Sequence, residues 1–195
     1  MIRFFFALLV FAFAALVLQH YIPPLPFLDG ARVMLLPLVF FFGAMALPVG
    51  GMLALAFCCG LMWGALNAQI IEMGRPVVEQ ALGGTVIIYG LLGAMMNGLR
   101  PLFLRGRWEI YTLMSALGTS LLLLVEFFML SVRRAALSGE SFFWGSEIWW
   151  RIGGPGLVAL LLAPFVYFFL KSVAAWLGCH LHLFAERAEE EARTS

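Results

Sequence analysis

The chain alternates between long apolar blocks and short segments that hold most of its charged residues. No charged residue occurs from Phe4 to Leu18, and blocks of the same texture recur five more times. A helix needs about 20 residues to cross the hydrocarbon core of a bilayer. The blocks lack the alternation typical of barrel strands, so they indicate helices. We expect six membrane-spanning helices, over residues roughly 4–19, 33–47, 50–71, 81–98, 110–132 and 154–177.

The composition agrees with a chain whose solvent is lipid. Hydrophobic residues make up 63% of the 195 positions and charged residues 12%, which is about half the charged fraction of a soluble domain. The net charge of +1 predicts neither a nucleic-acid partner nor a strongly acidic substrate. The predicted fold class is an all-α membrane protein, a compact bundle of about six transmembrane helices. It occupies residues 1–178, and a polar cytoplasmic tail follows over 179–195.

The distribution of basic residues predicts the orientation of the bundle. Six crossings place both termini on one side, and that side holds seven lysines and arginines against five on the other. This excess favours cytoplasmic termini in a multi-pass inner-membrane protein. The loop from Arg100 to Arg107 supports that orientation because it holds three arginines and no acid, whereas Arg133 and Arg134 argue against it. No convincing cleavage pattern follows the first block, so we expect a retained helix.

Small residues form stripes in the third and fourth apolar blocks. Gly60 and Gly64 are four residues apart, a spacing that lets another helix backbone approach closely. Gly90, Gly93 and Gly98 repeat the theme in the next block. The stripes predict a tightly packed helical centre, although the ordinary tolerance of glycine in membrane helices explains any single pair equally well.

Glu126 is the only acidic residue well inside a predicted span. A carboxylate in a membrane is costly unless it is protonated, paired or facing a polar cavity. One interpretation is a carboxylate that binds a proton or substrate. The other is a hydrogen-bonding residue that fixes the fifth helix to its neighbours or to a partner helix. No second acid or intramembrane histidine accompanies it, so a proton relay has little support.

The remaining polar residues give weak signals of chemistry. Cys179, His180 and His182 are three close potential ligands without a fourth, so they do not predict a metal site. Asn67 and Asn97 lie near span ends, where amides usually form hydrogen bonds between helices. The sequence has no phosphate-binding glycine loop and no nucleophile elbow. We therefore expect no catalytic residue, metal or cofactor.

The order of several short motifs resembles the rod shape-determining protein MreD family over residues 10–177. A proline-containing loop follows Leu18-Gln19, and later elements keep the family's order. Those elements are the apolar run from Val33, the turn Leu47-Pro48-Val49-Gly50-Gly51, Phe57 and Gly60, Leu82-Gly83, Pro155, and Leu162-Ala163-Pro164-Phe165.

The resemblance implies a non-enzymatic role and a fold similar to the substrate-binding subunits of energy-coupling-factor transporters. Proteins of this family belong to the cell-wall elongation machinery of the bacterial inner membrane. Their associates are a single-span scaffold protein (MreC-like) and, either directly or through it, an actin-like filament and peptidoglycan synthases. The partner-binding residues expected here, some of which could meet anionic membrane lipid, are Glu126, Gly60, Gly64, Arg100, Arg105 and Arg107.

Two other functions fit the same architecture. The first is the vitamin-binding membrane subunit of an energy-coupling-factor transporter, which needs polar and aromatic groups in one cavity that opens outward. Few residues besides Glu126, Trp63 and Asn67 suit such a cavity, which favours the scaffold-binding function. The second is a membrane enzyme acting on lipid, which needs acids or histidines gathered at the interface, and no such cluster is evident.

Overall fold

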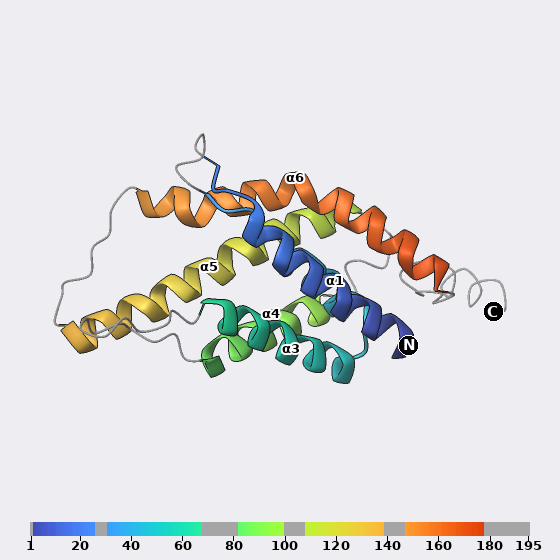
Figure 1. Ribbon diagram of the computed structural model, residues 1–195, viewed down its shortest axis with the longest axis horizontal. Helices are drawn as coiled ribbons and strands as arrows, with labels where there is room; N and C mark the ends of the chain where they lie inside the picture. Colours follow the sequence, from blue (N-terminus) through green and yellow to red (C-terminus); the bar gives the residue numbers. More distant parts are fainter. Residues whose placement is uncertain (1, 26–30, 68–81, 100–107, 139–146, 178–195) are drawn as a thin grey trace.

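The computed structural model describes residues 2–25, 31–67, 82–99, 108–138 and 147–177 and forms an all-α bundle (Figure 1). Each predicted span coincides with one helix over most of its length, so the predicted fold class is confirmed. The helices are α1 (Ile2–Tyr21), α2 (Leu36–Ala46), α3 (Val49–Asn67), α4 (Leu82–Gly98), α5 (Trp108–Ser138) and α6 (Glu147–Trp176).

Four helices are long and apolar enough to cross a membrane. They are α1, Val49–Leu66 of α3, Trp108–Met129 of α5 and Ile152–Trp176 of α6. Their outward faces expose large apolar side chains such as Phe13 and Phe165, which a lipid surrounding accommodates. The start of α1 and the end of α6 lie at the same end of the bundle, as an even number of crossings requires (Figure 1). The chain is therefore a multi-pass membrane protein.

The short helix α2 lies at the centre of the bundle and contacts all five other helices. Every one of its 11 residues is buried, and its length of about 16 Å is roughly half the hydrocarbon thickness. The predicted span of 33–47 was therefore too long as a helix, because residues 31–35 are not helical. Pro37 lies in the first turn of α2, where its missing N–H removes no helical hydrogen bond.

Side-chain amides satisfy both ends of α2. At its start, Oε1 of Gln19 accepts hydrogen bonds from the backbone N–H groups of Leu35 and Leu36, at 3.0 and 3.2 Å. At its end, Nδ2 of Asn97 donates to the carbonyl oxygen of Ala44 at 2.9 Å. Unsatisfied backbone groups are costly away from water, so these bonds allow a helix to end inside the bundle. The interhelical hydrogen bond predicted for Asn97 is confirmed.

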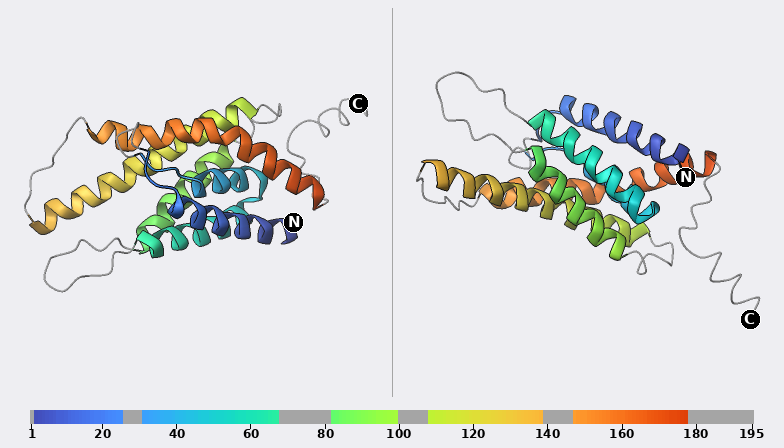
Figure 2. Two further views of the ribbon diagram at one scale, coloured as in Figure 1. Left: turned by 45° about the horizontal axis from the view of Figure 1, so that its top comes forward. Right: turned by 90° about the horizontal axis from the view of Figure 1, so that it is seen from below.

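The helices α5 and α6 are the longest, with 31 and 30 residues. In Figures 1 and 2 they extend beyond α3 and α4 at the end opposite the N-terminus. Helix α6 begins at Glu147 rather than at the predicted residue 154, so Pro155 lies inside it. The next residue, Gly156, lies against α5, where a Cβ atom would collide with Oγ of Ser120 and lie 3.2 Å from the carbonyl oxygen of Ala116, so the two helices pack closely there.

Candidate functional site

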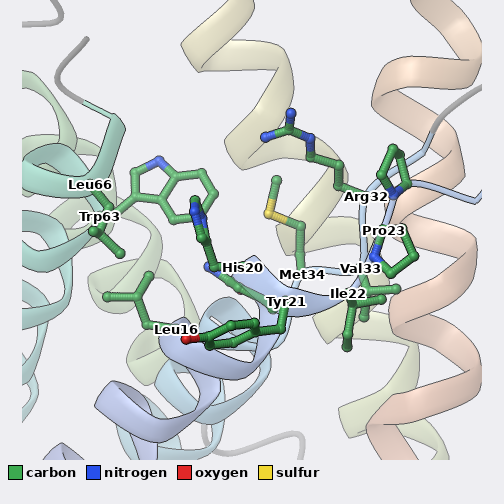
Figure 3. Close-up of a pocket in the computed structure, with 12 residues that line it drawn as sticks. Leu16, His20, Tyr21, Ile22, Pro23, Arg32, Val33, Met34, Trp63 and Leu66 are labelled. Carbon is green, nitrogen blue, oxygen red and sulfur yellow. The ribbon is translucent and has the colours of Figure 1, made fainter. Parts of the chain in front are cut away.

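A cavity of about 350 Å³ lies between α1 and α3, at the end of α1 opposite the N-terminus (Figure 3). The end of α1, the segment after it, the segment before α2 and the end of α3 form its walls. The lining residues are Leu16, Gln19, His20, Tyr21, Ile22, Pro23, Pro24, Arg32, Val33, Met34, Trp63 and Leu66.

The chain forms one wall of this cavity by folding back after α1. Pro23 and Pro24 fix the backbone where the helix has ended, because proline has a restricted φ and no N–H. The backbone N–H of Leu25 then donates to the carbonyl oxygen of Ala31 at 3.0 Å, which closes the loop. The hydrogen bonds that the N–H groups of Leu35 and Leu36 donate to Oε1 of Gln19 hold the segment before α2 against α1.

The cavity lining combines cationic, aromatic and apolar groups. Figure 3 shows Trp63 and His20 side by side, with the guanidinium of Arg32 across the cavity from them. Arg32 and His20 are exposed, whereas Trp63 is only 7% exposed. None of the described residues that line the cavity is acidic. The arrangement can pair with an anionic group and pack against a flat apolar one.

Trp63 also connects the cavity to the only acidic residue that lies well inside a predicted span. Its indole N–H donates a hydrogen bond to Oε1 of Glu126, which joins α3 to α5. Glu126 is half-buried and does not line the cavity. The structure thus contains the helix-fixing hydrogen bond that was one of the two interpretations of Glu126. The same bond fixes the indole in the cavity wall.

A third helix adds a polar group to this contact. The phenol of Tyr89 in α4 is 1% exposed and lies within electrostatic range of Glu126. Its hydroxyl has no hydrogen-bond partner among the described residues. Sequence reasoning missed Tyr89, because Glu126 belongs to another helix and no local pattern links the two residues. A buried phenol of α4 therefore lies in the same region of the bundle as the carboxylate of Glu126.

The predicted close helix approach at Gly60 occurs within the chain. A Cβ atom at Gly60 would lie 2.6 Å from the Cα atom of Val86, so the backbones of α3 and α4 touch there. The hydroxyl of Thr85 donates to the carbonyl oxygen of Gly60 at 2.8 Å and strengthens the contact. Gly64 is also buried. A role for either glycine in binding a partner stays a prediction.

Several predicted features lie outside the described residues. They are Arg100, Arg105 and Arg107, the tail over 179–195, and Cys179, His180 and His182. Within the described ranges, no three His, Cys, Asp or Glu side chains gather in a way that could hold a metal ion.

No protein-family model, no curated protein and no solved structure matches this chain. The resemblance to the MreD family therefore rests on the short motifs alone. The helices establish a membrane bundle, and the function has to be argued from its contacts and its cavity.

Proposed function

We propose that this chain is a non-enzymatic subunit of the bacterial cell-wall elongation complex, located in the inner membrane with cytoplasmic termini. In this role it binds a single-span scaffold protein and, through it, supports peptidoglycan synthesis and cell shape. The order of motifs from Leu18 to Phe165 supports the proposal. A compact membrane bundle is also the architecture that such a subunit requires.

The observation that carries the non-enzymatic part of the proposal is the hydrogen bond from Trp63 to Glu126. A general acid or base must reach the group that reacts. Glu126 instead holds α5 against α3 and does not line the cavity. It therefore contributes to the shape that the bundle presents to other membrane proteins.

The predicted partner-binding residues take different parts in this proposal. Gly60 and Gly64 are buried, so they set how closely α3 and α4 pack and affect a partner only through that shape. Arg100, Arg105 and Arg107 lie outside the described residues, and in this proposal their positive charge serves to bind anionic lipid or a cytoplasmic partner.

A pull-down of the tagged protein from its own membranes in mild detergent tests the proposal. We expect a single-span scaffold protein and peptidoglycan synthases to co-purify. An unrelated tagged polytopic protein from the same membranes serves as the control for non-specific capture. Recovery of paired cytoplasmic ATPases with a second membrane subunit would overturn the proposal.

The cavity favours a second candidate function, the substrate-binding subunit of an energy-coupling-factor vitamin transporter. Such a subunit needs aromatic and polar groups around one opening, and Trp63, His20, Tyr21 and Arg32 surround this cavity. The volume of about 350 Å³ suits a small ligand. A water-soluble vitamin that raises the unfolding temperature of the purified protein would favour this function over the first.

A further inference from the structure

We propose that the cavity between α1 and α3 binds an amphipathic anion, with its anionic group at Arg32 and its apolar body against Trp63. The anionic group is a phosphate or a carboxylate. This inference rests on the cavity alone and holds whichever of the two functions is correct. A failed pull-down therefore does not contradict the anion-binding proposal. A failed anion-binding test likewise does not contradict the elongation-complex proposal.

The cationic side of the cavity is available to a ligand. Arg32 is exposed, and no described residue pairs with its guanidinium. A guanidinium forms two parallel hydrogen bonds with a carboxylate or phosphate, and such bonds are among the strongest in proteins. His20 lines the same cavity, and its imidazole ring offers a second hydrogen-bond donor beside the guanidinium. None of the described lining residues is acidic. The charge of the lining therefore selects an anion.

The opposite side of the cavity suits an apolar body. Trp63 presents a large ring, and Leu16, Val33 and Leu66 complete the apolar part of the lining. The hydrogen bond to Glu126 holds the indole in place before a ligand arrives. A fixed aromatic surface loses little conformational freedom on binding, which favours affinity. Glu126 is thus a positioning residue that acts through Trp63.

The depth of the cavity suits an amphiphile. Helix α1 has 20 residues and is about 30 Å long, which equals the hydrocarbon thickness of a bilayer. The cavity lies at the far end of this helix, a position that corresponds to the level of the lipid headgroups when α1 spans a bilayer. Both the headgroup of an anionic lipid and a dissolved organic anion can reach that level.

Native mass spectrometry of the full chain with added phosphatidylglycerol tests the proposal. We expect Arg32→Gln to lower the retained phosphatidylglycerol about tenfold, because a charge-assisted hydrogen-bonded pair is lost. Arg3→Gln is the matched control, since Arg3 is also exposed but lies in the first turn of α1, at the end of that helix away from the cavity. Arg32→Lys keeps the charge but not the paired hydrogen bonds, and we expect intermediate retention.

A second arm identifies the source of the anion. The unfolding temperature of the wild type and of Arg32→Gln is measured with and without inorganic phosphate, and the two should agree without ligand because Arg32 is exposed. Stabilisation by phosphate in the wild type alone assigns a dissolved anion. Loss of lipid retention in Arg32→Gln without a phosphate effect assigns a lipid headgroup. Equal behaviour of Arg32→Gln and Arg3→Gln in both arms would overturn the proposal.

The role given to Glu126 has its own readout in the same assay. Glu126→Gln keeps an acceptor for the indole of Trp63 and should preserve phosphatidylglycerol retention, whereas Glu126→Leu should lower it. Neither substitution alters a residue that lines the cavity. Equal retention in both variants would remove Glu126 from the site.

Discussion

Two neighbouring positions on α3 make opposite kinds of contact. At Gly60 the helix touches the backbone of α4, where a Cβ atom would lie 2.6 Å from the Cα atom of Val86. About one turn later, Trp63 reaches to Glu126 of α5 and forms the wall of a cavity of about 350 Å³. Lipid gives helices little hydrophobic reason to associate, so side-chain size decides where they close together. We call the first contact the Gly60 seam and the second the Trp63 wall.

The seam and the wall also differ in how they are hydrogen bonded. In the Gly60 seam, the short side chain of Thr85 donates its hydroxyl to the backbone carbonyl oxygen of Gly60, so the helices stay close. The wall uses two long side chains, which span a wider gap and leave space beside them. Substitutions can test each feature separately, because the two contacts share no residue.

The largest expected effect comes from placing a side chain in the seam. Gly60→Leu should destabilise the protein by about 3 kcal/mol, because the nearest atoms belong to the backbone of Val86 and cannot rotate away. Thermal unfolding in mild detergent measures the loss. Gly90→Leu is the matched control in α4, since a Cβ atom there meets nothing within 4 Å. An equal loss in both variants would show that the seam has no special requirement for glycine.

A smaller effect is expected at the wall. Glu126→Leu removes the acceptor used by Trp63 and should cost about 1–2 kcal/mol, whereas Glu126→Gln keeps an acceptor and should cost less. The free energy of unfolding of both variants, alone and combined with Trp63→Phe, measures the coupling. Additive losses for Glu126→Leu and Trp63→Phe would contradict a direct role of this hydrogen bond.

The smallest effect concerns the hydrogen bond within the seam. Thr85→Val should cost about 0.6 kcal/mol, the average for hydrogen bonds between membrane helices. Thr112→Val is the control, because the hydroxyl of Thr112 bonds to the carbonyl oxygen of Glu109 in its own helix at 2.7 Å. Unfolding temperatures that shift equally in the two variants would mean that the Thr85 bond adds nothing specific to the seam.

The apolar blocks predicted all six helices, since a long apolar segment in lipid must satisfy its backbone internally. The boundaries were less predictable. Helix α2 is shorter than its block because amides of Gln19 and Asn97, from other helices, satisfy its ends inside the bundle. Helix α6 begins at Glu147, before the predicted residue 154, and therefore includes Pro155.

The candidate site was harder to predict from the sequence than the fold was. Glu126 was an evident candidate because an acid in an apolar block is rare. Its partner Trp63 is 63 residues away, and Tyr89 belongs to a third helix, so no spacing pattern connects the three. In the sequence, Arg32 served only as one of the basic residues that predict the orientation of the bundle. The structure shows that it faces Trp63 across the cavity (Figure 3).

The sequence by itself determined that this protein is surrounded by lipid, that it is helical and that it has glycines which permit close contact between helices. These properties depend on composition and on neighbours within a few residues, which a single chain displays directly. The tertiary structure alone decided that Gly60 faces α4, that Trp63 meets Glu126 and that a cavity opens beside them. Those contacts join residues far apart in the chain, so they are fixed only when the helices have packed against one another.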